Sequence, residues 1–383
     1  MKFNYFLMFS LVLITTESRS QEPIETENSA DDREVLFIGT YTKKEGHVDG
    51  KAKGIYKIYR NKETGALQMG ETIARLTNPS YVIVSKDKQN LYAVSELGES
   101  DAASGFIYSY QINPDYSVKQ VGKISTGSYA PCHITMDKTE KFVFVSNYVG
   151  GVVMVYKRRE DGSLERVQKV NLENSEGSNA HSVTISSNNQ RAYVADLGND
   201  KIWIFNLNQE TGELNLHPQA FVSLQNGSGP RHFTISKNGK FSYSINEINS
   251  SVSVFSVMKE GGLKVIQNIP SLPEDYYGNN SAADIHLHPT GKFLYVSNRG
   301  HNSIASFKVD PKTGKLSVLE FISTGGKVPR SFAVSKDGRF LYVANQDSDT
   351  INVFKVDQNS GLLTSTGTPL QIKTPVSIDF NQK

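Results

Sequence analysis

Short apolar runs that alternate with polar residues recur along the chain, separated by turns rich in Gly, Asn and Asp. Residues 229–257, GPRHFTISKNGKFSYSINEINSSVSVFSV, hold three such runs, with a Lys-Asn-Gly-Lys turn after the first. Alternation with a period of two indicates half-buried strands, and Asn-Gly is among the strongest hairpin signals. Almost no helical periodicity appears beyond residue 33, so the pattern predicts an all-β chain.

This pattern repeats, and each copy continues through a turn, such as Asp-Pro-Lys-Thr-Gly at residues 310–314, into a fourth strand. The first strands of the copies open at intervals of 46 to 52 residues, at Pro79, Pro131, Ala180, Pro230, Ala282, Pro329 and Pro375. Four strands at this period are typical of one blade of a β-propeller.

The two ends of the repeat region are incomplete in complementary ways. Residues 35–60 look like the rear of a blade without its first strand, and PVSIDF at residues 375–380 supplies a first strand alone. Joining them closes a ring, which removes the exposed sheet edges of an open array. We therefore predict a seven-bladed β-propeller with four-stranded blades, forming a single domain over residues 34–383.

A column of aromatic residues occupies one position of the second strand in six copies: Tyr92, Phe144, Tyr193, Tyr243, Tyr295 and Tyr342. An aromatic that recurs at a fixed blade position is expected to pack between blades rather than to bind a ligand. The single tryptophan, Trp203, on the third strand of its blade, is interpreted in the same way.

The first 20 residues, MKFNYFLMFSLVLITTESRS, place a lysine before an apolar run that ends at about Ile14. The run is too short to span a bilayer and is typical of a secretory signal peptide. Residues 21–33 are acidic and polar, as in a flexible leader. We expect an exported protein, periplasmic or extracellular.

Charge and cysteine content narrow the range of partners. A net charge of +2 does not indicate a nucleic acid or an anionic membrane as partner. Cys132 is the only cysteine, which excludes a disulfide within the chain. We expect a monomer without a membrane span, acting on a small molecule.

Two columns of polar residues break the repeat. One follows the residue that opens each first strand and includes Arg231 and His232; the other ends each second strand and includes Glu247. The start of strand one and the end of strand two lie at the same edge of an antiparallel hairpin. Arg231, His232 and Glu247 are therefore expected at one rim of the ring.

The same columns bring further polar residues to this rim: Asn147, His181, Asp196, Asp284, Arg299 and Arg330, with His286 one step deeper. Three arginines at a narrow lip repel one another unless an anion binds there. Some residues also have a structural interpretation: Asn298 and Asn345 as loop caps, His286 as an inner-strand histidine, and His217, His288 and His301 as turn or surface residues.

From about Val35 onward the chain resembles the bacterial lactonase family of seven-bladed propellers, typified by propeller-type 6-phosphogluconolactonase and related to the fungal carboxymuconate-lactonizing enzymes. The resemblance is carried by GPRH with NEINSSV, AADIH with YVSNR, VPRSF, SNYVGG at residues 146–151 and ADLGNDKI at residues 195–202. It implies lactone hydrolysis without an obligatory metal or other cofactor. Arg231, His232 and Glu247 match the family's proposed reaction centre, and the surrounding lip is matched by His181, Asp284, His286, Arg299 and Arg330.

Hydrolysis of a lactone needs an activated water, a group that stabilises the oxyanion and an acid for the ring oxygen. His232 or Glu247 would be the base, and the sequence does not decide between them. Arg231 would stabilise the oxyanion, while Arg299 and Arg330 would hold a carboxylate or phosphate of an anionic sugar lactone. No serine lies in a nucleophile-elbow context, which disfavours an acyl-enzyme.

Three alternatives stay open at this level. Glu96, Asp196 and Glu247 could meet across the ring around a divalent cation. A cycloisomerase acting on an unsaturated dicarboxylate would use the same arginines. A propeller that only binds a ligand or a protein is the third alternative, which export favours. Export also separates the chain from phosphorylated sugar lactones, which are made in the cytosol.

Overall fold

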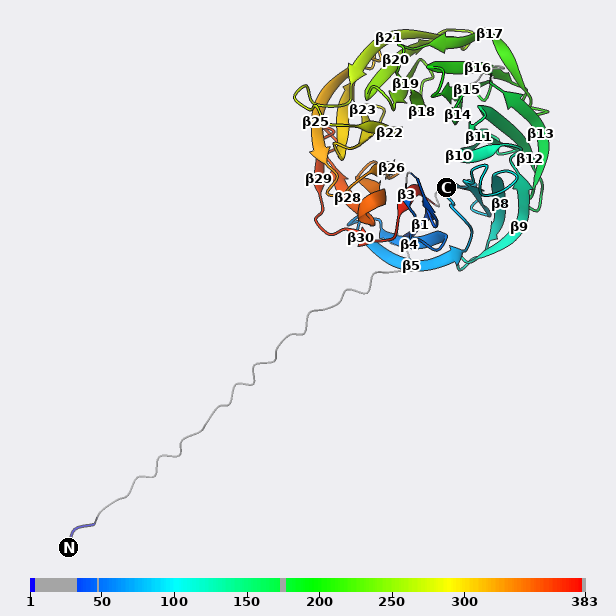
Figure 1. Ribbon diagram of the computed structural model, residues 1–383. Coiled ribbons are helices and arrows are strands. Elements are labelled where there is room, and N and C mark those ends of the chain that lie inside the picture. Colours follow the sequence, from blue (N-terminus) through cyan, green and yellow to red (C-terminus); the bar gives the residue numbers. More distant parts are fainter. Residues whose placement is uncertain (4–32, 47, 173–176, 381–383) are drawn as a thin grey trace.

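The computed structural model describes residues 1–3, 33–46, 48–172 and 177–380. Seven antiparallel sheets are arranged as a ring, with β10, β14, β18, β22 and β26 nearest to its centre (Figure 1). The predicted signal peptide at residues 1–20 and the leader at residues 21–33 fall almost entirely outside the described residues. No helix within the described ranges has the length and apolar character needed to cross a membrane.

Each blade runs from an inner first strand to an outer fourth strand. The first blade consists of β31 (Pro375–Phe380), β1 (Arg33–Thr40), β4 (Ile55–Asn61) and β5 (Leu67–Ala74). The second consists of β6 (Val82–Val84), β7 (Asn90–Ser95), β8 (Phe106–Ile112) and β9 (Val118–Ser125). The third consists of β10 (Tyr129–Met136), β11 (Phe142–Val149), β12 (Val152–Arg158) and β13 (Leu164–Asn171). The fourth consists of β14 (Ala180–Ile185), β15 (Arg191–Asp196), β16 (Lys201–Leu207) and β17 (Leu214–Ser223).

The remaining blades follow the same order. The fifth consists of β18 (Pro230–Ile235), β19 (Phe241–Asn246), β20 (Ser251–Val257) and β21 (Leu263–Pro270). The sixth consists of β22 (Ser281–Leu287), β23 (Phe293–Arg299), β24 (Ser303–Val309) and β25 (Leu316–Ser323). The seventh consists of β26 (Pro329–Val334), β27 (Phe340–Asn345), β28 (Thr350–Val356) and β29 (Leu363–Ser365), with β30 (Leu370–Gln371) also paired to β28.

The ring closes within the first blade, as predicted. β1 pairs with β31 on one side, where Ile38 lies opposite Ile378, and with β4 on the other, where Ile38 lies opposite Tyr56. The C-terminal strand is therefore the inner strand of the blade that begins at the N-terminus. The seven-bladed, all-β architecture predicted from the repeat is confirmed.

The aromatic column packs between blades, as expected, and all six side chains are buried. Five are tyrosines, and each donates its hydroxyl to a glycine carbonyl in the outer turn of the next blade, as from Tyr243 to Gly314 at 3.0 Å. Gly314 has a φ of +72°, a conformation that glycine adopts without strain. Trp203 is also buried, and its Nε1 donates to Asp196 at 3.1 Å.

The first strands carry an irregularity at the rim that determines where the site residues point. The register shifts just after the opening residue in the third, fourth, fifth and seventh blades, leaving Cys132, His181, Arg231 and Arg330 without a cross-strand partner. The sixth blade shifts between Ala282 and Ile285. A bulge of this kind redirects side chains, so two consecutive residues can both face the rim.

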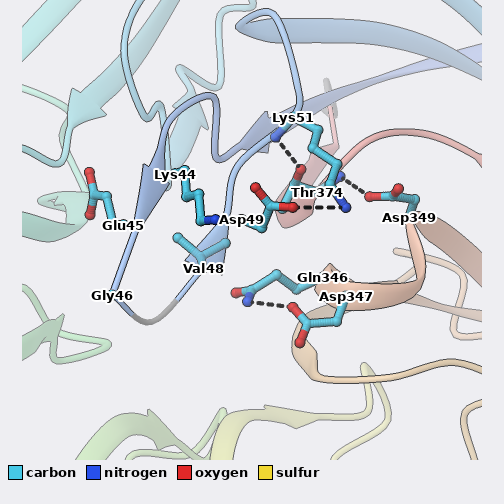
Figure 2. Close-up of a pocket in the computed structure, with 10 residues that line it drawn as sticks. All are labelled: Lys44, Glu45, Gly46, Val48, Asp49, Lys51, Gln346, Asp347, Asp349 and Thr374. Atoms are coloured by element: carbon cyan, nitrogen blue, oxygen red, sulfur yellow. Dashed lines mark hydrogen bonds and ion pairs between the residues drawn. The ribbon is translucent and has the colours of Figure 1, made fainter.

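A short hairpin extends from the first blade at the same rim. It is formed by β2 (Lys44–Glu45) and β3 (Val48–Asp49), and faces the loop after β27, which contains the 3-10 helix η2 (Gln346–Ser348). The two segments border a cavity of about 410 Å³ (Figure 2). Two of its charged residues, Lys51 and Asp49, form an ion pair at 3.2 Å.

Candidate active site

A second cavity, of about 350 Å³, lies where the first and second strands meet at the rim. Every blade except the first contributes to its lining, which consists of Glu96, Ala130, Cys132, Tyr148, His181, Arg231, Glu247, Arg299 and Arg330. Three arginines face two carboxylates, so the formal charge favours an anion.

Glu247 is the carboxylate that joins two of these arginines. Its Oε2 lies 2.9 Å from Arg231 Nε and 2.9 Å from Arg299 Nη2, while Oε1 accepts a hydrogen bond from Ser281 Oγ at 3.0 Å. Burial alone would raise the pKa of Glu247, but Arg299, Arg231 and Arg330 lower it to about 2. The carboxylate is therefore ionised at neutral pH and is a weak base.

Arg330 differs from the other two arginines. Within the described part of the chain its guanidinium has no hydrogen bond or ion pair and lies 5.3 Å from the ring of Tyr41. Burial lowers the pKa of Arg330, yet Tyr41, Glu96 and Glu247 more than offset this, and its pKa is raised. A charged guanidinium with unused donors facing a cavity is suited to a carboxylate or phosphate.

A much smaller cavity, of about 10 Å³, shares Glu96, Cys132, Arg231 and Arg330 with the larger one. Its other lining residues are Ser80, Tyr81, His232, Ser331 and Val376. About one probe sphere of space is enough for a single water molecule. The two cavities thus adjoin, with His232 beside the smaller one.

His232 is held by a carboxylate. Its Nδ1 lies 2.7 Å from Asp284 Oδ1, and its Nε2 lies 3.3 Å from Arg231 Nη1. Burial lowers the pKa of His232 to about 4, with Asp284 opposing and Arg231 reinforcing the shift. Because ionised Asp284 accepts a hydrogen bond from Nδ1–H, the neutral ring carries its lone pair at Nε2.

Asp284 is itself fixed by several donors. Its Oδ1 accepts from the Ile285 amide at 2.9 Å, and its Oδ2 accepts from Ser331 Oγ at 2.9 Å and from the Phe332 amide at 3.2 Å. Burial would raise the pKa of Asp284, but His286 and His232 hold it well below its usual range. The carboxylate is therefore ionised and rigidly oriented.

Two further histidines pack around His232. The ring of His133 lies 5.5 Å and that of His181 lies 5.3 Å from the His232 ring. Burial is the main cause that lowers the pKa of both well below the usual value. Both are neutral near pH 7, so they add no positive charge to that of the arginines.

Comparison with known proteins identifies the family of the chain. A family model described as a seven-bladed β-propeller lactonase matches residues 35–380. The chain belongs to this family. It is 30% identical to the 6-phosphogluconolactonase of Bacillus subtilis, over 78% of this chain and 84% of that protein. It is 32% identical to the 6-phosphogluconolactonase of Formosa agariphila, over 78% of this chain and 86% of that one.

Solved structures of lactonase propellers superpose closely. The periplasmic gluconolactonase of Pseudomonas aeruginosa is 32% identical with a TM-score of 0.84, covering 91% of this chain and 99% of that one. A putative 6-phosphogluconolactonase of Bacteroides fragilis is 30% identical with a TM-score of 0.83, covering 92% of this chain and 99% of that one. The resemblance inferred from the sequence motifs is confirmed, and the protein is a lactonase.

The structure brings most of the predicted site residues of this lactonase together. Arg231, Glu247, Arg299, Arg330 and His181 line the larger cavity, with His232 beside the smaller one. Asp284 lies behind His232, and His286 lies behind Asp284, outside the lining of both cavities.

Asn147 and Asp196 do not reach the site. Both are fully buried, and Asn147 donates Nδ2 to the Val152 carbonyl at 3.3 Å. Asp196 accepts from Ser178 Oγ at 2.7 Å and from Trp203 Nε1 at 3.1 Å. Each lies opposite the opening residue of its blade and caps the loop beside it, as do Asn298 and Asn345.

The alternative cation site is not formed in the described part of the chain, where no three His, Cys, Asp or Glu side chains could together hold a metal ion. Asp196 is committed to Ser178 and Trp203, so it does not join Glu96 and Glu247.

Sequence reasoning missed three residues as site residues: Tyr41, Tyr148 and His133. Tyr41 donates its hydroxyl to Glu96 Oε2 at 2.9 Å and lies under Arg330. Tyr148 and His133 stand in the two polar columns, next to Asn147 and Cys132, so the columns contained a signal for both. Tyr41 belongs to the connection after β1 and had no such signal.

Proposed function

We propose that this lactonase hydrolyses a sugar lactone of the gluconolactone type in the 350 Å³ cavity, with His232 as the general base. The observation that carries the proposal is the His232–Asp284 pair at 2.7 Å beside Arg231 and Arg330, which line both cavities. The pair supplies a base, and Arg231 supplies fixed positive charge at the place where an oxyanion would form, while Arg330 can hold an anionic group of the substrate.

In the first step, a water in the smaller cavity gives a proton to His232 Nε2 as its oxygen attacks the lactone carbonyl carbon. Asp284 stabilises the resulting imidazolium through Nδ1–H, as the carboxylate does in the serine-protease triad. Arg231 is held by Glu247 at 2.9 Å and by the Ala283 carbonyl at 2.5 Å, so its position is fixed before the oxyanion forms.

In the second step, the tetrahedral intermediate collapses and the bond from the carbonyl carbon to the ring oxygen breaks. The His232 imidazolium returns its proton to the ring oxygen, which becomes the hydroxyl of the open-chain acid. The acid then ionises, so one lactone and one water give one aldonate and one proton. No covalent intermediate with the protein is needed.

The contacts favour His232 over Glu247 as the base. Glu247 engages two arginines and Ser281, and its pKa of about 2 makes it a poor proton acceptor. His232 has a pKa of about 4 and lines the smaller cavity, where its Nε2 lies 3.3 Å from Arg231 Nη1. Glu247 is then the residue that orients Arg231 and Arg299 and partly neutralises their charge.

Arg330 supports a substrate that bears an anionic group, because its donors are unused among the described residues. A phosphate at one end of the sugar would suit it, as the name 6-phosphogluconolactonase given to two relatives implies for those proteins. The Pseudomonas aeruginosa protein is named a gluconolactonase, so a lactone without phosphate is the other substrate to test.

Export belongs to the same proposal. The apolar run after Lys2 supports a signal peptide cleaved before Gln21, and the Pseudomonas aeruginosa relative is named periplasmic. Mass spectrometry of the protein from its native cells tests this. A mature chain that begins at Gln21 supports export, and an intact Met1 contradicts it.

The test of the activity is proton release from glucono-δ-lactone and from 6-phosphogluconolactone, measured above spontaneous hydrolysis. The proteins are the parent, His232→Gln, Glu247→Gln and, as a matched histidine control away from the base, His301→Gln, with one EDTA-treated sample. We expect His232→Gln to abolish the excess rate and His301→Gln to retain it. Loss with EDTA, or full activity of His232→Gln, would overturn the assignment. Lactone formation from cis,cis-muconate without hydrolysis would indicate the cycloisomerase instead.

A further inference from the structure

His286 lies behind the site rather than in it. It stands on β22 two residues after Asp284, and its side chain is 40% exposed although β22 is an inner strand. The first strands of the neighbouring blades, β18 and β26, pack against β22 on its two sides. The exposed part of the ring therefore faces the axis of the propeller, beyond the lining of the two cavities.

Asp284 joins this histidine to the base. Its Oδ1 lies 2.7 Å from His232 Nδ1, and its Oδ2 lies 3.2 Å from His286 Nε2. The ring of His286 also packs edge-on against Phe332, with centroids 4.8 Å apart. One buried carboxylate thus bridges two imidazoles, one beside the reaction site and one open to solvent.

Few other charges act on His286. Burial lowers its pKa, but Asp284 more than compensates, so its pKa is raised above the usual value. On β26 the equivalent position is Ala333, and on β18 it is Thr234, as all three pair with the tyrosine of their blade. At the equivalent position of the other first strands that the structure describes, the ionisable side chain is Asp379 of β31, whose pKa burial raises to about 7.

We propose that His286 is a positioning residue which, through Asp284, holds His232 in its neutral form with Nδ1–H directed at the carboxylate. This role rests on the proposed function of His232 as the base. A protonated His286 shares the charge of Asp284 and so weakens its attraction for a proton on His232. In agreement, His286 is among the groups that lower the pKa of His232.

The benefit of this arrangement follows from the reaction. Each turnover produces an acid, so the local pH falls as substrate is consumed. A base that stays neutral down to about pH 4 continues to work in the acid that it generates. Because its pKa is raised above the usual value, His286 is protonated in the acid part of that range, and there it acts as a constant positive charge rather than as a switch.

The experiment measures the ionisation of His232 directly, by NMR of ¹⁵N-labelled imidazoles between pH 3 and 8. The proteins are the parent, His286→Asn, His286→Gln and a control, His288→Gln, whose imidazole contacts Gly338 and Thr290 instead of Asp284. We expect the pKa of His232 to rise by about one pH unit in both His286 variants. At pH 4 the neutral fraction would then fall from about a half to about a tenth.

The rate of lactone hydrolysis gives the second readout. The acid limb of kcat/KM should move toward neutral pH in the His286 variants by the same amount as the NMR titration, and stay in place in His288→Gln. An unchanged His232 titration in folded His286→Asn and His286→Gln proteins overturns the proposal. If the NMR titration moves while the rate profile does not, His286 acts on His232 but His232 is not the base, and the proposed function fails instead.

Discussion

Arg299 and Glu247 lie 2.9 Å apart although they stand on neighbouring blades, one at the end of β23 and the other just after β19. The same Oε2 also lies 2.9 Å from Arg231, so a single oxygen balances two guanidinium groups. Burial, reinforced by Arg231 and Arg330, lowers the pKa of Arg299 to about 10 despite this carboxylate. Glu247 therefore stabilises the site, while the positive charge of the arginines that it does not balance destabilises the site.

Replacing Glu247 with Gln should remove the carboxylate that balances the charge of the arginines. Three arginines would then face one another with only Glu96 nearby, and we expect the free energy of unfolding to fall by about 3 kcal/mol. Inorganic phosphate should restore much of the loss, because an anion would take the place of the carboxylate. Thermal unfolding with and without phosphate measures both effects. Equal phosphate stabilisation of the parent and the variant would contradict this account.

Arg330 should discriminate between the two lactones. Arg330→Ala removes the guanidinium that has unused donors, so KM for 6-phosphogluconolactone is expected to rise about 10- to 100-fold. KM for glucono-δ-lactone should change much less, since that lactone has no anionic group. Lys327→Ala, which removes an exposed lysine three residues earlier, serves as the control. An equal rise for both lactones would assign Arg330 to the oxyanion rather than to the phosphate.

Acid should destabilise the fold in two steps. His232 has a folded pKa of about 4 against about 6.5 when unfolded, so the unfolded state binds the extra proton between these values. About 3 kcal/mol of stability is lost as pH falls from 6.5 to 4, and buried His133 and His181 add to the loss. Glu247, with a folded pKa of about 2, adds a second loss below pH 4.5.

His286 opposes the first step, because its raised pKa stabilises the fold below pH 6.5 and that contribution disappears as pH rises through the folded value. Urea unfolding at a series of pH values measures the summed contribution of these groups to the free energy of unfolding. The slope should correspond to a net uptake of more than one proton on unfolding near pH 5. Stability that stays constant between pH 7 and pH 4 would show that these histidines are not neutral in the fold.

Much of the fold could be predicted because it depends on patterns that are local in the sequence. Strand period, Asn-Gly turns and the spacing of the opening residues each repeat, and ring closure follows from the two incomplete ends. The pairing of Arg231 with Glu247 could be predicted too, since it lies within one hairpin.

The side-chain directions at the rim could not be predicted in this way. Asn147 and Asp196 lie opposite Pro131 and Ala180 and are buried within their blades, while the residue after Asn147, Tyr148, reaches the cavity. A period of two does not reveal the bulge that lets Arg231 and His232 serve adjoining cavities. The contact of Arg330 with Tyr41 joins residues that only ring closure brings together.

The tyrosines between blades should each contribute to stability. Tyr243→Phe removes a buried hydroxyl and leaves the Gly314 carbonyl without that donor, at an expected cost of about 1–2 kcal/mol. Tyr277→Phe is the matched control, because Tyr277 is 92% exposed. Chemical unfolding of the two variants compares them. Equal stabilities would mean that the hydroxyl bond adds nothing beyond the packing of the ring.

The pairing of β1 with β31 also determines when the protein can become active. The ribosome makes β31 after every other strand of the seven sheets, yet the first blade lacks its inner strand until β31 arrives. Blades two to seven can form in order as they emerge, whereas the ring stays open, with the inner edge of β1 unpaired, until translation has passed residue 380. Until β31 has been made, a nascent chain is therefore inactive and most accessible to chaperones and proteases.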